Sequence, residues 1–195
     1  MEKITTKEII KFKKAKLKYP IIKELETRFS PRFFKEEKID NKIINSIIES
    51  ARWAPSAYNY QPWYFYWSPK GSVAYKKIFS SLSERNQWAK TAPVLVVACY
   101  LKEREGKMND FAQYDLGLSV MSMITQAQSL GAYTRQMGLF DHNKLQKLLN
   151  ISNEYEPFVV LAVGKIGDYS KIGEELLDRE LQKRERKTNI SKKLL

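Results

Sequence analysis

The hydrophobic residues of the chain follow two different spacings in alternating segments. Spacings of three and four residues, which gather side chains on one face of a helix, predict helices over residues 4–18, 21–27, 40–54, 73–82 and 141–150. Apolar or aromatic runs bounded by turn residues predict strands over residues 63–67, 93–101, 132–138 and 157–164. Helices and strands are thus interspersed, without a regular strand–helix–strand repeat.

Polar residues and a proline mark the ends of several of these helices. Tyr19-Pro20 ends the first helix, and Asp40 and Asp141 are well placed as N-caps of two others. The side chains expected to point toward the core are Ile4, Ile9, Phe12 and Leu17 in the first helix and Ile43, Ile44, Ile47 and Ile48 in the one that follows Asp40.

The longest predicted helix, residues 110–130, is apolar on nearly all sides. Gly117, Ser119, Ser122 and Ala127 are its small positions, and Gly131 is placed to end it. A helix of this kind must be covered on several sides. One domain of 195 residues has little mass with which to cover it, so the pattern favours a homodimer.

The composition indicates one globular domain over residues 1–195 with two basic ends. Apolar residues make up 43% of the chain, and no linker divides it. The net charge of +12 attracts anions, and much of it lies in the predicted N-terminal helix within residues 1–20 and in a tail over residues 178–195. Such runs are usually solvated faces, and they leave a basic nucleic-acid-binding protein open as an alternative.

The apolar segments do not predict a membrane protein. The longest strongly apolar run, Val94 to Leu101, is far too short to cross a bilayer, and the N-terminus lacks an uninterrupted apolar core and a cleavage site. One cysteine, Cys99, lies inside that run, so it cannot form an internal disulfide. We therefore expect a cytoplasmic protein that binds neither membranes nor nucleic acid.

Few side chains in the sequence can carry out chemistry by themselves. With His142 as the single histidine, a serine–histidine–aspartate triad, a cysteine–histidine pair and a histidine zinc site are excluded. Cys99 suits packing in a strand better than nucleophilic attack, and no glycine-rich phosphate loop is present. If the protein is an enzyme, we expect a cofactor to carry its reaction, with no catalytic side chain and no metal.

Two segments instead carry groups suited to a flat, anionic ligand. Arg28, Ser30 and Arg32 alternate in RFSPRFF, so an extended backbone would turn two guanidinium groups and a hydroxyl to one face. Arginine binds phosphates and planar anions bidentately. In the second segment, residues 55–62, small polar side chains lie between two prolines, which predicts a rigid loop that hydrogen-bonds something flat.

Six segments resemble, in order and in separation, those of the nitroreductase family of FMN-dependent oxidoreductases. They are RFSPRFF, ARWAPSAYNYQPWYF, NQWAKTAPVLVVA, DLGLSVMSMITQAQSLGAYTRQMGLFD, YEPFVVLAVGKIGD and RERK, and the resemblance covers residues 25–187. The combination of R-x-S-x-R with the later P-S-x-x-N-x-Q-P-W is its most specific part.

The resemblance implies an α+β fold of three layers, in which helices flank a central, mostly antiparallel sheet. It also implies an intertwined homodimer that binds two FMN molecules at the subunit interface. NADH or NADPH would reduce the flavin, which would then reduce a small organic oxidant such as a nitroaromatic, a quinone or an enone in ping-pong turnover.

The resemblance further implies a role for each matching residue. Arg28 and Ser30 would reach the phosphate and the ribityl chain, and Arg32 would lie at N1 and O2 of the flavin. The partner's loop would line the ring, and a later segment would place a backbone N–H at flavin N5. The loop residues are Pro55, Ser56, Ala57, Asn59 and Gln61, the later segment is Gln136, Met137, Gly138 and Leu139, and the phosphate would also be held by Arg184 and Arg186, with Lys187 beside them.

The chain departs from the family pattern in three places. Leu139 stands where glycine is common, Ala57 replaces a frequent serine, and the stretch after Leu101 is short, so a small lid is expected. A flavin-degrading or dehalogenating relative on the same fold is an alternative, although such relatives usually have longer lids. No residue distinguishes NADH from NADPH.

Overall fold

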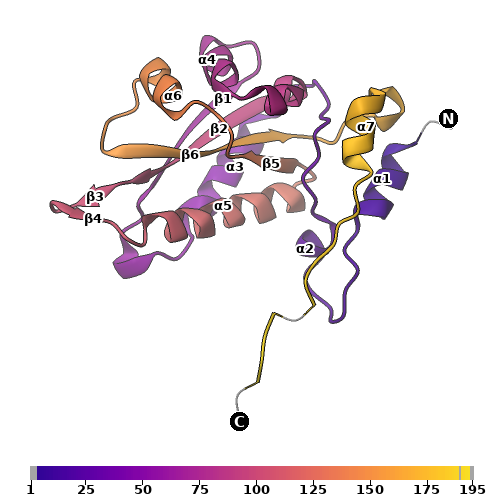
Figure 1. Ribbon diagram of the computed structural model, residues 1–195, viewed down its shortest axis with the longest axis horizontal. Coiled ribbons are helices and arrows are strands. Elements are labelled where there is room, and N and C mark those ends of the chain that lie inside the picture. Colours follow the sequence, from indigo (N-terminus) through magenta and orange to yellow (C-terminus); the bar gives the residue numbers. More distant parts are fainter. Residues whose placement is uncertain (1–3, 189, 194–195) are drawn as a thin grey trace.

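A four-stranded antiparallel sheet forms the centre of the computed structural model, which describes residues 4–188 and 190–193 (Figure 1). The predictions for residues 1–3, 189 and 194–195 lie outside the described residues. The strands are β1 (Trp63–Pro69), β2 (Val94–Leu101), β6 (Tyr155–Gly164) and β5 (Tyr133–Met137), in this spatial order, so all four predicted strands are present. A short hairpin, β3 (Glu103–Arg104) and β4 (Lys107–Met108), follows β2.

The alternation of side chains along β2 divides the core into two halves. Val94, Val96 and Ala98 pack in one cluster with α3 (Asn41–Arg52) and α5 (Ala112–Ser129). Leu95, Val97 and Cys99 pack in the other with α4 (Val73–Ser81) and α6 (His142–Leu149). Figure 1 shows the two helical layers on opposite faces of the sheet. The expected three-layer α+β arrangement is confirmed.

Most helix ends follow the signals in the sequence. Asp40 accepts a hydrogen bond from the backbone N–H of Lys42 at the start of α3, and Asp141 does the same for Lys144 at the start of α6. Gly131 has a φ of +73° and follows the last residues of α5, as a C-terminal glycine does.

The first helix is shorter than predicted. Helix α1 spans Thr6–Lys13, because the chain then turns and the N–H of Ala15 bonds to the carbonyl of Glu26 in α2 (Lys23–Thr27). Phe12 and Leu17 are 43% and 41% exposed, so their predicted inward orientation was wrong, whereas Ile9 is fully buried.

The predicted C-terminal tail begins too early. Residues 178–180 are the end of helix α7 (Glu174–Glu180), which lies beside α1 (Figure 1). Sequence reasoning missed this helix because its first turn and its end carry charged residues, and the apolar Leu176 and Leu177 that pack on the core form only a short stripe.

Candidate functional site

The arginine segment follows α2 as an extended stretch. Arg28 Nη1 donates to the hydroxyl of Ser30 at 3.3 Å, so these two side chains share a face. Pro31, which lies between Ser30 and Arg32, is buried. Arg28 and Ser30 therefore present a guanidinium and a hydroxyl side by side.

The C-terminal segment brings a second set of arginines to the same place. Arg184 Nη1 donates to the carbonyl of Lys13 at 3.1 Å and to that of Glu26 at 3.4 Å. In return, Lys13 Nζ donates to the carbonyl of Gln182 at 2.6 Å. These bonds fix residues 182–184 between the end of α1 and α2, so residues from the two ends of the chain meet in one cluster.

This cluster carries an excess of positive charge. Burial, followed by repulsion from Arg186, lowers the pKa of Arg28. Burial, then Arg28 and Arg186, lowers the pKa of Arg184. Like charges that depress one another in this way favour the binding of an anion, which would relieve the repulsion. We refer to Arg28, Ser30, Arg184 and Arg186 as the cationic cluster.

Arg32 points toward α7 and is held there by two acceptors. Its Nη1 donates to a carboxylate oxygen of Glu180 at 2.9 Å and to the carbonyl of Arg179 at 3.2 Å. Its Nε is buried and has no hydrogen-bond partner in the described part of the chain. Such an orphan N–H is rare in folded proteins unless a ligand or a partner satisfies it.

A further arginine, Arg135 in β5, joins the arginine segment. Its Nη1 donates to the carbonyl of Ser30 at 2.5 Å, and its guanidinium lies over the ring of Trp88 at 5.4 Å from the centroid. Burial, followed by the charge of Arg32, lowers the pKa of Arg135 to about 10.

The loop over residues 55–62 is tightly closed on itself. The hydroxyl of Ser56 accepts from the N–H of Gln61 at 3.0 Å, and Gln61 Nε2 donates to the carbonyl of Asn59 at 3.1 Å. Tyr58, Asn59 and Gln61 all have positive φ, at 51°, 58° and 49°. Residues other than glycine rarely adopt this backbone conformation. Its repetition within four residues is typical of functional loops.

A buried acid anchors this loop. The carboxylate of Asp115, which is 1% exposed, accepts from the N–H of Ala57 at 3.1 Å. Asp115 lies in the first turn of α5, where the helix dipole favours a negative charge. Pro55 and Asn59 remain exposed, so the anchored loop presents part of its polar surface outward.

The loop and the cationic cluster lie at opposite ends of α5 within one chain. The loop is tied to Asp115, whereas the side-chain amide of Gln128, near the other end, donates to the hydroxyl of Thr27 beside Arg28. Thirteen residues of helix separate these two points, which is roughly 20 Å at the usual rise. Figure 1 shows α2 near one end of α5 and the loop near the other.

The segment Gln136, Met137, Gly138 and Leu139 runs from the end of β5, an edge strand of the sheet, into the loop before α6. Met137 is buried, and a Cβ built on Gly138 would meet open space. Leu139 is 55% exposed, and its carbonyl accepts from Ser83 and from the amide of Asn86. The backbone here is therefore accessible from outside the chain.

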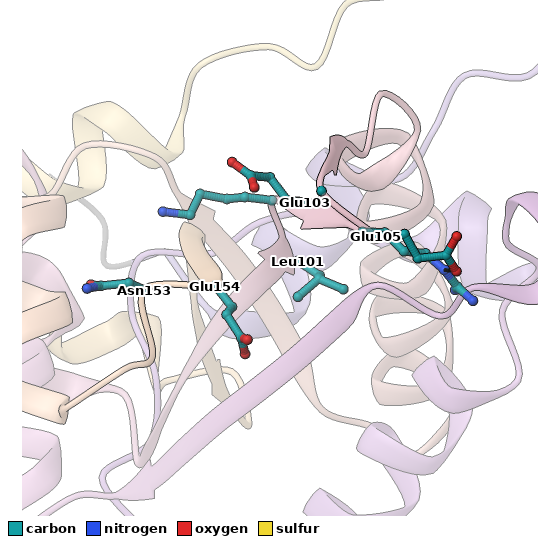
Figure 2. A pocket seen from close by; sticks show the side chains of 8 residues that line it. Leu101, Glu103, Glu105, Asn153 and Glu154 are labelled. Atoms are coloured by element: carbon teal, nitrogen blue, oxygen red, sulfur yellow. Dashed lines mark hydrogen bonds and ion pairs between the residues drawn. The ribbon is translucent and has the colours of Figure 1, made fainter.

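Two hollows on the surface are lined by residues outside the cationic cluster. One of about 630 Å³ is lined by residues 101–106 with Asn153 and Glu154; Figure 2 shows that Glu103, Glu105 and Glu154 point in different directions around it. The other, of about 450 Å³, adjoins the loop through Tyr58 and Tyr60. The first has no convergent polar groups of the kind that a ligand site needs.

Three further observations concern the alternatives raised by the sequence. Within residues 4–188 and 190–193, no three metal-ligating side chains gather at a point, and no helix is both long and apolar enough to cross a membrane. Cys99 is fully buried, and burial raises the pKa of its thiol to about 12. Packing is therefore its role, as predicted.

The fold is that of a three-layer α+β protein, and one part of it gathers the arginines of the cationic cluster. The family model described as the nitroreductase family matches residues 25–87 and 73–165, which overlap and together span most of the chain. The chain therefore belongs to the nitroreductase family, and it is an oxidoreductase.

Individual relatives agree with this assignment. A solved structure described as an oxidoreductase containing FMN is 30% identical, with 90% of this chain and 92% of that chain covered and a TM-score of 0.83. A protein of Methanothermobacter thermautotrophicus named "Putative NADH dehydrogenase/NAD(P)H nitroreductase" is 23% identical over 75% of this chain and 78% of its own length. A nitroreductase family protein from Clostridium novyi NT shares the fold, with 21% identity, coverage of 73% and 84%, and a TM-score of 0.66.

Sequence reasoning missed four polar residues of this region. They are Lys13, Asp115, Arg135 and Glu180, each of which the fold buries or partly buries beside a predicted site residue. Asp115 and Arg135 are the charged residues within otherwise weakly charged segments, which is the signal that could have drawn attention to them. Lys13 and Glu180 lie in charged runs and carry no such signal.

Proposed function

We propose that the protein binds FMN and uses it to transfer hydride from NADH or NADPH to a small organic oxidant such as a nitroaromatic, a quinone or an enone. The observation that carries this proposal is the cationic cluster, in which Arg28 and Ser30 meet Arg184 and Arg186 across almost the whole chain. Membership of the nitroreductase family and the FMN named in the description of one relative support the same cofactor.

The donors present suit FMN. Two or three guanidinium groups and a hydroxyl match a phosphate and the start of a ribityl chain. Arg32 is a further donor, because its side chain is 19% exposed and its printed bonds use Nη1. When bound, FMN supplies the chemistry by accepting a hydride and passing it to the oxidant. Arg32 would stabilise the negative charge that reduction places at N1 and O2.

A homodimer would complete the site. The ring must meet the loop of residues 55–62, yet that loop lies about 20 Å along α5 from the cationic cluster of its own chain. A second copy can supply the loop from its own α5. The face of α5 that turns away from the sheet supports this, because Tyr114 and Met121 on it are 67% and 38% exposed.

The test begins with the cofactor of the purified protein. Heat-released ligand should be FMN on chromatography, and anaerobic mixing with NADH or NADPH should bleach the flavin before any oxidant is added. A panel of nitroaromatics, quinones and enones should then restore the colour and give parallel-line steady-state kinetics. Release of FAD, or failure to bind FMN on reconstitution, would overturn the proposal.

A further inference from the structure

A buried carboxylate that the proposed function does not use lies behind Arg32. Glu180 is the last residue of α7 and is 1% exposed. One oxygen accepts from Arg32 Nη1 at 2.9 Å, and the other accepts from the hydroxyl of Tyr169 at 2.7 Å. Glutamate is almost never fully buried unless it is paired, because its charge is costly to remove from water.

These contacts fix the side chain of Arg32 in one orientation. The carbonyl of Arg179 provides a second acceptor for the same Nη1 at 3.2 Å. Tyr169 is itself 1% exposed, and burial, followed by the charge of Glu180, raises the pKa of its hydroxyl, which keeps the hydroxyl a neutral donor. Among the described residues Arg32 is anchored through Nη1, and its Nη2 is left for another acceptor.

Glu180 also carries a negative charge close to several cationic side chains. Arg32 contributes to the lowered pKa of Arg135, and Lys13 has a pKa that burial lowers and Glu180 raises. A carboxylate at hydrogen-bond distance from a partly buried guanidinium offsets much of the field that the guanidinium produces at points farther away.

We propose, on the basis of the proposed function, that Glu180 is a positioning residue for the flavin that also tunes its reduction potential. It holds Arg32 by Nη1 with Nη2 directed to the ring. Its charge offsets part of the positive field of Arg32, so the reduced, anionic flavin is less stabilised than Arg32 alone would make it. The flavin is consequently a stronger hydride donor to the oxidant.

The variant Glu180→Gln tests this proposal without removing the hydrogen bonds. The amide oxygen can accept from Arg32, and the amide nitrogen can donate to the oxygen of Tyr169. We expect FMN to remain bound. The affinity for reduced FMN relative to oxidised FMN should rise about tenfold, which raises the two-electron potential by about 30 mV. Equilibration with a redox dye of known potential measures the shift on fully loaded protein.

Glu175→Gln is the matched control. It makes the same change of charge in the first turn of the same helix, at an exposed position. Its potential should equal that of the wild type. Equal potentials in Glu180→Gln and Glu175→Gln would overturn the role of Glu180 while leaving the flavin assignment intact. A wild type that binds no FMN would instead overturn the proposed function, and this inference with it.

A second variant covers the case in which Glu180→Gln does not fold. Arg32→Gln/Glu180→Gln leaves neither partner charged and alone in the interior, which avoids the penalty of a single buried charge. Its potential should fall below that of the wild type, because the guanidinium nearest the ring is gone. An unchanged potential would show that the pair does not act on the flavin.

Discussion

The two halves of the proposed site, at opposite ends of α5, are built in opposite ways. The cationic cluster is charged and is assembled from segments at both ends of the chain, such as Arg28 and Arg184. The loop of residues 55–62 is uncharged and continuous, and it closes through hydrogen bonds between neighbours such as Ser56 and Gln61. Trp53 and Tyr58, beside and within it, are 75% and 82% exposed.

This difference indicates what each half requires. The cluster gathers its positive charge within one chain and therefore suits an anionic ligand. The loop bonds several of its own polar groups, and its exposed aromatic side chains suit a covering surface, because large exposed apolar groups often mark binding sites. Under the proposed function, strain in the loop and charge in the cluster serve one ligand independently, and variants can separate them.

The largest expected effect is on stability and belongs to Arg32. Arg32→Ala would leave Glu180 buried without its partner, and removing one member of a buried ion pair costs about 3–5 kcal/mol. Urea denaturation of the apoprotein measures the loss. Arg28→Ala is the comparison, since Arg28 makes one long bond to Ser30 and is repelled by Arg186. Equal losses in the two variants would contradict the ion pair's structural role.

The second-largest expected effect distinguishes contacts with the FMN phosphate from contacts with its ring. Arg28→Ala should weaken FMN binding by roughly 10- to 150-fold, the equivalent of one hydrogen bond to a charged group. Riboflavin, which has the same ring without the phosphate, should bind as it does to the wild type. Flavin fluorescence titration of the apoprotein measures both. Lys171→Ala, at a 78% exposed position, controls for the loss of one positive charge. Parallel losses for FMN and riboflavin would place Arg28 at the ring instead.

A change that loosens the loop should weaken the binding of FMN and of riboflavin equally. Asp115→Ala removes the acceptor of the Ala57 N–H, which costs about 1–3 kcal/mol, and the melting temperature should fall by roughly 2–4 °C for each kcal/mol. FMN and riboflavin should lose affinity by the same factor, because the loop is expected to contact only the ring. Asp115→Asn, which keeps an acceptor, is the milder control.

The reactivity of Cys99 shows whether the effect of Asp115→Ala is confined to the loop. Burial keeps its thiol protonated, with a pKa raised to about 12, so alkylation near pH 8 requires global opening. Alkylation of Asp115→Ala should stay slow in native buffer while the loop becomes sensitive to protease. Rapid alkylation would show that the whole domain, and not the loop, has loosened.

The smallest effect is the most informative about assembly. If the loop acts across the interface, a mixed dimer of an Arg28→Ala chain with an Asn59→Ala chain contains one site in which both halves are wild type. Such dimers, separated by two affinity tags, should bind FMN at about half the wild-type stoichiometry with wild-type affinity. If both halves came from the same chain, each site would carry one defect and no tight site would form.

The sequence predicted the elements whose hydrophobic spacing is strong, and it failed where polar residues are buried. The strands and α3, α4, α5 and α6 were found because one periodicity continues through each of them. Residues 178–180, the end of helix α7, were taken for part of the tail, since Glu180 looks like every other charged residue of DRELQKRERK until the fold places it at 1% exposure. The pairing of Arg32 with Glu180 joins residues 148 apart, and no local pattern encodes such a contact.

The same reasoning explains the site. Arg28, Ser30 and Arg32 could be selected from the sequence as phosphate-binding candidates only with the family resemblance, because many protein surfaces carry the R-x-S-x-R spacing. The sequence could not show which arginines bond to other parts of the protein, because Arg32 and Arg135 are distinguished from Arg28 only by their neighbours in space. Whether the ligand contacts in each half form as proposed stays a prediction.

The bonds from Arg184 to Lys13 and Glu26 also determine when the cationic cluster can form. They join residues 171 and 158 positions apart, so Arg28 and Ser30 leave the ribosome long before their counterpart is synthesised. Strand β6, which joins β2 to β5, ends at Gly164 and is synthesised shortly before Arg184, so the sheet and the cluster are both completed late in synthesis. A phosphate-bearing cofactor would consequently be captured by the finished polypeptide and would not guide its early folding.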